Sequence, residues 1–214
     1  MGVLGLAAAY LMTRRIFPGK DMLEAIITLP LVMPPVVTGF ILLMLIGRQG
    51  PIGKILESVF HTQIVFTPLA AILAAAVVSF PLMYQSSKAA FQSIDQRLED
   101  AARTLNASEL KVFFTITLPL AWHGLTAGLV LSFARAMGEF GATAMVAGNI
   151  PGKTQTIPVA IYFASEGNDL TKAGFYVIVI SVITFILVYS VNHWSRRQIA
   201  RLTEGKSLNV KSND

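Results

Sequence analysis

The chain has 214 residues, of which 54% are hydrophobic and 14% charged, and its mean hydropathy is +0.62. Soluble domains carry about 25% charged residues, so this composition excludes an ordinary soluble domain and favours an integral membrane protein. The chain has no cysteine, which excludes a disulfide framework and a thiolate metal site. The net charge is +5, but no basic stripe with interleaved aromatic residues accompanies it, so we expect no nucleic acid partner.

The N-terminal part of the chain predicts one partial and one complete membrane span. Residues 1–13 are uncharged and apolar, but a span needs roughly 20 residues, so we interpret them as a truncated first span. A basic connection follows, and residues 25–47 then carry no charge and predict a full span. This span contains Pro30, Pro34 and Pro35. Prolines free backbone carbonyls, so they indicate either a structural kink or an irregular segment that lines a path.

Three further apolar stretches have the length of a span: 64–85, 122–146 and 173–193. The polar stretch 148–171 lies before the last of them, and its part 157–164 predicts a short amphipathic helix across the outer mouth. We therefore expect an all-α integral membrane protein with about five transmembrane helices. Residues 1–195 would form the transmembrane domain, and residues 196–214 a cytoplasmic tail.

The distribution of Lys and Arg predicts which side each connection faces. The tail carries five basic residues, the segment 88–111 four and the first connection three, whereas each remaining connection carries two. Short loops rich in Lys and Arg stay in the cytoplasm. The three most basic segments also fall on one side when five spans alternate. The segment 88–111 and the C-terminus are therefore predicted to be cytoplasmic.

The charged segment 88–119 has the pattern of two short helices joined by a turn. One apolar face at helical spacing consists of Leu98, Ala101, Ala102 and Leu105. Asn106 falls where a helix would end in a left-handed residue, and Ser108 can cap a second helix that has Glu109 in its first turn. A second apolar face follows, with Leu110, Phe113 and Phe114, and Pro119 is expected to close the unit.

This segment resembles the coupling loop of ABC importer permeases. The family pattern is acidic-Ala-Ala, three residues, Gly, nine residues and Ile-x-Leu-Pro. Here it reads Asp100-Ala101-Ala102, then Asn106, then Ile116-Thr117-Leu118-Pro119. Asp replaces Glu and Asn replaces Gly, and both substitutes keep the physical role. The resemblance implies that an ATPase subunit docks on Asp100, Ala101, Ala102, Arg103, Leu105 and Asn106.

Charged residues also occur inside a predicted span, at Arg135 and Glu139. Their spacing of four places them on one helix face, and ionisable groups at membrane depth usually pair with one another. One reading is a structural ion pair that fixes helix position. The other places Arg135 near an anion path, with Glu139 tempering its charge. Gly138 and Gly141 beside them would permit close helix approach.

No catalytic, nucleotide or metal site is predicted. One Arg and one Glu without a nucleophile or a second carboxylate do not make an enzyme site. The run Gly148–Thr154 ends in Gly-Lys-Thr, but the first glycine of a phosphate-binding loop is replaced by Ala147. His61, His123 and His193 are isolated in sequence and lack metal-ligand spacing.

A wider resemblance covers nearly the whole chain. Four regions resemble molybdate permeases of the ABC class: Phe17–Lys20, Leu29–Gly39, Ser79–Met83 and Ser132–Ile161. This implies a type I ABC importer permease in the bacterial cytoplasmic (inner) membrane, working as a homodimer with two cytoplasmic ATPase subunits. A periplasmic or lipid-anchored molybdate-binding protein would deliver the anion. ATP and Mg²⁺ would bind the ATPase and no cofactor this chain. The alternatives are sulfate or tungstate as substrate, and a non-transporting membrane scaffold.

Overall fold

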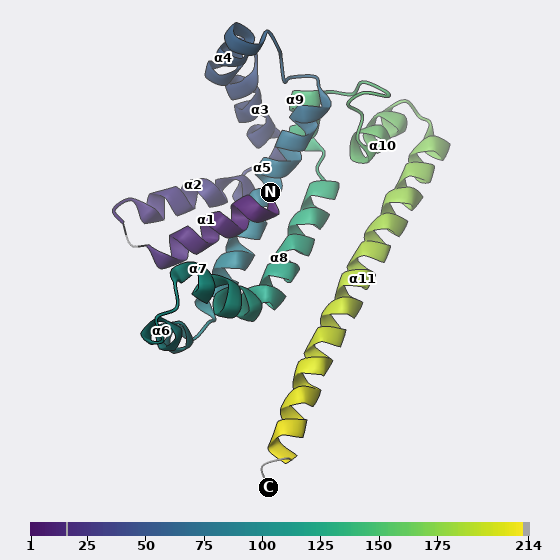
Figure 1. Ribbon diagram of the computed structural model, residues 1–214. Coiled ribbons are helices and arrows are strands. Elements are labelled where there is room, and N and C mark those ends of the chain that lie inside the picture. The colour runs from purple at the N-terminus through teal and green to yellow at the C-terminus, as the bar shows by residue number, and fades with distance from the viewer. Residues whose placement is uncertain (16, 212–214) are drawn as a thin grey trace.

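The computed structural model describes residues 1–15 and 17–211, with the backbone alone for residues 191, 192 and 194–211. All regular elements of the described residues are helical, which confirms the predicted all-α fold (Figure 1). In chain order they are α1 (Gly2–Arg14), α2 (Lys20–Val32), α3 (Pro35–Ile46), α4 (Pro51–Phe60), α5 (Pro68–Gln92), α6 (Gln96–Thr104), α7 (Glu109–Val112), the π-helix η1 (Phe113–Thr117), α8 (Leu118–Met137), α9 (Gly141–Ala147), α10 (Ile157–Glu166) and α11 (Leu170–Lys211).

Within these described residues, three helical stretches are long and apolar enough to cross a membrane: Pro68–Gln92, Glu109–Met137 and Leu170–Ser190. A fourth crossing is possible if the bent pair α2 and α3 counts as one span. Helix α1 has 13 residues, as expected for a partial span, and α10 confirms the short helix predicted after residue 156.

Residues 25–47 do not form one continuous helix, and the break falls at two of the three prolines that indicated a kink or an irregular segment. The direction of the chain changes by 119° between α2 and α3. Met33 is extended because a residue before proline is excluded from the helical region, and Pro34 is extended too. Pro35 then starts a new helix at a position where its missing N–H costs nothing. The consecutive prolines therefore break the helix into two arms.

The predicted span 122–146 is also shifted. Its helix begins at Glu109, and Pro119 lies inside it rather than closing the unit. The turn η1 makes this possible, because the Leu118 amide donates to the Phe113 carbonyl five residues back, and the wider turn accommodates the proline. The span ends at Met137, and α9 follows as a separate helix after a short break.

Helix α5 lies at the centre of the packing. Near its start, small residues such as Ala70 and Ala74 are fully buried in a cluster with α3 and α9. Near its end, Tyr84 and Phe91 are buried in a second cluster with α1 and α8. Burial of these apolar surfaces is the main source of stability between the helices. The two clusters hold α5 at both ends.

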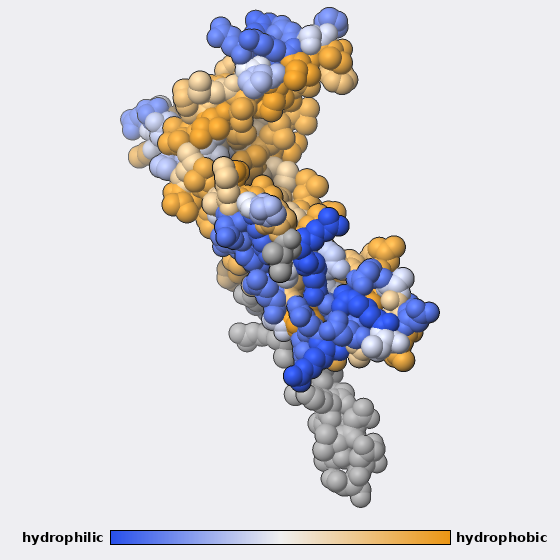
Figure 2. Space-filling view, turned by 90° about the vertical axis from the view of Figure 1, so that its left-hand side faces the viewer, coloured by the Kyte–Doolittle hydropathy of each residue, from blue (hydrophilic) through white to orange (hydrophobic). Residues whose placement is uncertain are grey.

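The polar ends of the molecule are separated by apolar surface. Figure 1 shows α4, α9 and α10 at one end, and α6 with the C-terminal end of α11 toward the other. On the face drawn in Figure 2, hydrophobic residues gather between a hydrophilic upper end and a larger hydrophilic lower region. Helix α11 runs through the predicted boundary at residue 195 without a break. The side chains of the predicted tail 196–214 lie outside the described residues.

Candidate coupling surface and buried ion pair

The segment resembling a coupling loop forms the helix, turn and helix that its sequence predicts. Asp95 caps α6 by accepting a hydrogen bond from the Arg97 amide at 3.0 Å, a cap that the sequence reasoning missed. Asn106 ends the helix in the left-handed region with φ of +61°, as predicted. The Ser108 side chain accepts from the Lys111 amide at 3.4 Å and so caps α7, again as predicted.

Several large apolar residues around the turn of this segment face outward, although Val112 is buried and Phe113 is partly buried. Leu105 is 84% exposed and Leu110 is 72% exposed, while Ala101 is exposed and Ala102 half-buried. Large exposed apolar side chains beside charged ones are typical of protein interaction sites. The exposed apolar residues are Leu98, Ala101, Leu105 and Leu110. Beside them lies the Arg103 cluster, which consists of Arg103, Asp100 and Glu109, and we call the two together the coupling surface.

Arg103 organises the charges of the coupling surface. Its Nε and Nη2 atoms donate to both carboxylate oxygens of Glu109, at 2.7 and 3.1 Å, and its Nη1 donates to Asp100 at 2.7 Å. The hydrogen bond from Arg103 holds the pKa of Glu109 below its ordinary value, and the same carboxylates raise the pKa of Arg103. The paired geometry joins α6 to α7 across the turn.

Glu99 is a functional candidate that the sequence reasoning missed. It is adjacent to Asp100 on α6, yet it is fully buried. Its carboxylate accepts a hydrogen bond from the Arg14 guanidinium at the end of α1 and from the Thr117 hydroxyl of η1, the latter at 2.6 Å. No spacing in the sequence links residues 14, 99 and 117, so only the tertiary fold reveals this cluster.

The predicted pair of Arg135 and Glu139 is present. Arg135 Nη1 donates to Glu139 Oε2 at 2.8 Å. However, Glu139 lies beyond the end of α8, in the break before α9, rather than on a continuous helix face. Its other oxygen accepts from the Ala142 amide at 2.8 Å, and the residue is 2% exposed. The carboxylate therefore joins the end of α8 to the start of α9.

Gly138 and Gly141, the two glycines beside this pair, differ in how closely other atoms approach them. A Cβ atom on Gly141 would lie 3.0 Å from the Pro35 side chain and 3.2 Å from the Val36 amide nitrogen, so α3 approaches α9 closely there, as predicted. A Cβ atom on Gly138 would meet nothing nearer than 3.8 Å. The predicted close approach at Gly138 is therefore wrong, because this residue instead terminates α8.

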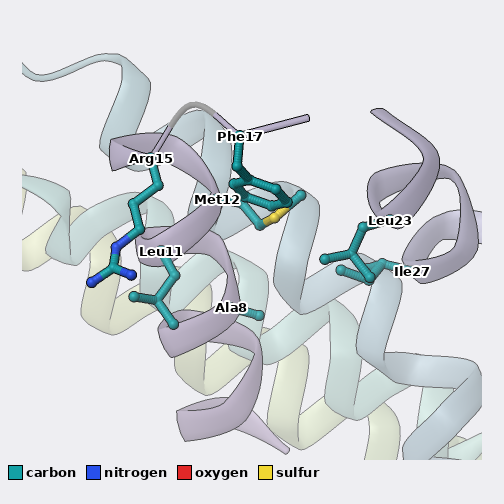
Figure 3. Close-up of a pocket in the computed structure, with 7 residues that line it drawn as sticks. All are labelled: Ala8, Leu11, Met12, Arg15, Phe17, Leu23 and Ile27. Carbon is teal, nitrogen blue, oxygen red and sulfur yellow. The ribbon is translucent and has the colours of Figure 1, made fainter. Parts of the chain in front are cut away.

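Two pockets differ in character. The larger, of about 670 Å³, lies between α1 and α2, and Figure 3 shows its mainly apolar lining with Arg15 at the edge. Such a lining does not suit a small oxyanion. A smaller pocket of about 180 Å³ includes Glu139, Thr143 and Thr156 among its lining residues. Thr156 is polar and its hydroxyl has no hydrogen-bond partner among the described residues. The break after α8 thus borders a small cavity whose mostly apolar lining includes these three polar side chains.

No group of three potential metal-ligating side chains occurs in the part of the chain that the structure describes. The segment 148–154 is a turn in which the Thr154 hydroxyl accepts from the Ile150 amide at 3.2 Å, so its hydroxyl serves the local fold.

Several long apolar helices with an exposed, charged helix pair at one end are typical of a multi-pass membrane protein. The chain belongs to the family described as the binding-protein-dependent transport system inner membrane component, which matches residues 1–201.

Two relatives and one solved structure illustrate this similarity. The chain is 48% identical over 189 residues to a Bacillus subtilis (strain 168) protein named as a molybdenum transport system permease, YvgM, covering 88% of this chain and 83% of that one. It is 44% identical over 202 residues to the molybdenum transport system permease protein ModB of Escherichia coli (strain K12), covering 94% and 88%. A solved bacterial ABC transporter that imports alginate shares the fold, with a TM-score of 0.70 at 18% identity over 90% of this chain and 71% of that one.

Proposed function

We propose that this chain is the permease subunit of an ABC importer that carries molybdate across the bacterial cytoplasmic membrane. The observation that supports this proposal best is the identity of 44–48% to relatives named as molybdenum transport permeases. That identity extends over segments that include the coupling surface and the α8–α9 break. The chain itself performs no covalent chemistry, and it binds neither ATP nor Mg²⁺.

In this proposal two copies of the chain form the translocation path between them. Two cytoplasmic ATPase subunits bind the coupling surfaces, and a periplasmic or lipid-anchored protein delivers molybdate at the opposite end. ATP binding brings the ATPases together and opens the path outward, and hydrolysis resets it. The C-terminus lies in the cytoplasm on the same side as α6, in agreement with the positive-inside rule.

The coupling surface supplies the contacts that such a partner needs. Leu105 and Leu110 offer apolar area, and Ala101 is small enough to let α6 enter a groove deeply. The Arg103 cluster forms a charged rim around this area. Exposed ion pairs contribute little affinity, so the apolar residues carry the binding and the charges set its orientation.

The decisive experiment is uptake of labelled molybdate into vesicles that contain this chain and its ATPase, with loaded binding protein and ATP. We expect ATP-dependent uptake, and we expect unlabelled molybdate to inhibit it more strongly than sulfate or tungstate does. Stronger competition by sulfate or tungstate would reassign the anion. Absence of ATP-dependent uptake of all three oxyanions would contradict the transport function.

A docking variant tests the coupling surface separately. Ala101→Glu places a bulky charge on α6, and we expect it to abolish co-purification of the ATPase and uptake together. The matched control is Ser58→Glu on α4, which adds the same charge at an exposed position at the other end of the molecule. Unchanged assembly and uptake in Ala101→Glu would refute the assignment of this surface.

A further inference from the structure

Glu99 is the buried counterpart of the coupling surface. Asp100 next to it is exposed and belongs to the surface, whereas Glu99 faces the opposite way and is fully buried against the spans. Helix α6 therefore carries adjacent carboxylates with different environments. A carboxylate without solvent contact needs charged and hydrogen-bonding partners to be tolerated.

The partners of Glu99 come from two other elements. Arg14 is the last residue of α1, and Thr117 is the last residue of η1, directly before α8. Arg103, one turn further on α6, has its Nη2 atom 3.8 Å from Glu99 Oε2. Glu99 thus joins the coupling helix to the first helix and to the base of the α8 span at one point.

We propose that Glu99 is a positioning residue that transmits movement of the coupling helix to α1 and α8, a role that rests on the proposed function. Helix α6 packs mainly on α7 and η1, and the Arg103–Glu109 pair already joins it to α7, so the Glu99 ion pair is the contact that adds α1 to this unit. With the ion pair, a displacement of α6 by the ATPase displaces the end of α1 and the start of α8 together.

The surroundings of Arg14 extend the connection further into the molecule. On the same helix, Tyr10 contacts Phe113 of η1 and Phe91 of α5 edge to face, with ring centroids 4.8 and 5.6 Å apart. A second ion pair joins Lys88 of α5 to Glu24 of α2. Movement that reaches α1 is therefore passed to α5, which packs on it. From α5 it is passed to α2, and α3 at the far side of the bend packs against α9.

The first experiment measures molybdate taken up for each ATP hydrolysed in three variants. Glu99→Gln removes the charge but keeps the shape and the hydrogen bond to Thr117. Arg14→Met with Glu99→Gln removes both charges, so that no buried charge is left without a partner and the fold is preserved. Glu57→Gln, an exposed carboxylate paired at 3.8 Å with Arg48, is the matched control.

We expect both Glu99 variants to retain the ATPase during purification and to hydrolyse ATP. Their uptake for each ATP should fall at least tenfold, while the control stays within twofold of the wild type. If the double variant transports as efficiently as the wild type, the ion pair serves stability alone and the proposal is wrong. Failure of the wild type itself to transport would instead contradict the proposed function.

The second experiment needs no change at the ion pair. The chain has no native cysteine, so spin labels can be placed at Leu4 on α1 and Arg97 on α6, both exposed. In dimers diluted with unlabelled chain, we expect the distance between these labels to stay constant when ATP binds. A single label at Arg97 in both copies should report a change between the two coupling helices. If the Leu4–Arg97 distance changes as much, α6 moves independently of α1 and the role of Glu99 is refuted.

Discussion

Arginine–carboxylate clusters at the two ends of the α7–α8 span are built from the same chemistry but placed differently. The Arg103 cluster at the start of the span is exposed, with the Asp100 and Glu109 side chains each 67% accessible. The Arg135–Glu139 pair at the end of the span has a Glu139 side chain that is 1% accessible. Exposed pairs are worth little to stability, whereas removing one partner of a buried pair is costly. The first cluster is therefore suited to a partner, and the second holds two helices of the chain together.

The largest loss of stability is expected when the buried carboxylate of Glu139 is removed. Glu139→Ala leaves the Ala142 amide and Arg135 without their acceptor, so we expect a loss of about 2–4 kcal/mol in unfolding free energy. Thermal unfolding in detergent micelles measures it. Glu57→Ala at the exposed pair on α4 should change stability by less than about 0.5 kcal/mol. Equal effects of the two variants would contradict the distinction between buried and exposed pairs.

A second large effect is expected where α3 meets α9 at this same end. A Cβ atom on Gly39 would lie 2.6 Å from Ala142 Cα, so Gly39→Ala must push the two helices apart. We expect a cost of about 1–3 kcal/mol, measured by the same unfolding assay. Gly174→Ala on α11 is the control, because nothing lies within 4 Å of its added Cβ. A neutral Gly39→Ala would show that α9 packs loosely against α3.

At the exposed end, the backbone of the turn should matter more than its charges. Asn106 has φ of +61°, a conformation that disfavours residues with a Cβ atom other than Asn and Asp. Asn106→Ala should therefore cost about 1 kcal/mol, while Asn106→Gly should be neutral or slightly stabilising. Hydrogen exchange of the α6 and α7 amides checks this locally. Equal protection in both variants would contradict a role for this conformation.

The sequence predicted what depends on neighbours along the chain. The left-handed Asn106, the Ser108 cap and the pairing of Arg135 with Glu139 all follow from spacings of a few residues. Charge and apolar length likewise predicted the all-helical membrane fold, and the family motif led to the coupling segment.

The features that the sequence did not predict depend on how prolines interrupt helices and on contacts between residues far apart in the chain. The three prolines of residues 25–47 left open a structural kink or an irregular segment, and the extended Met33 and Pro34 divide the stretch into two helices. Pro119 suggested an end, but the π-turn η1 absorbs it. Glu99 was not predicted as a site residue, because its partners Arg14 and Thr117 are brought to it only by folding.

The smallest effect concerns the titration of Glu109 in the exposed cluster. Arg103 lowers the pKa of Glu109 in the folded chain. The Arg103–Glu109 pair therefore stabilises the α6–α7 turn fully at pH values above 4.5, the ordinary pKa of a Glu side chain. That contribution is lost as the pH falls through the lowered pKa. We expect hydrogen exchange of the turn to accelerate slightly on acidification below pH 4.5, and less so in Glu109→Gln, which has no charge to lose. A Glu109→Gln variant with the same pH dependence as the wild type would assign the effect to another carboxylate of the segment, with Asp100 the nearest to Arg103. The difference should also shrink at high salt, because exposed pairs are screened, whereas the buried pair at Glu139 should respond little.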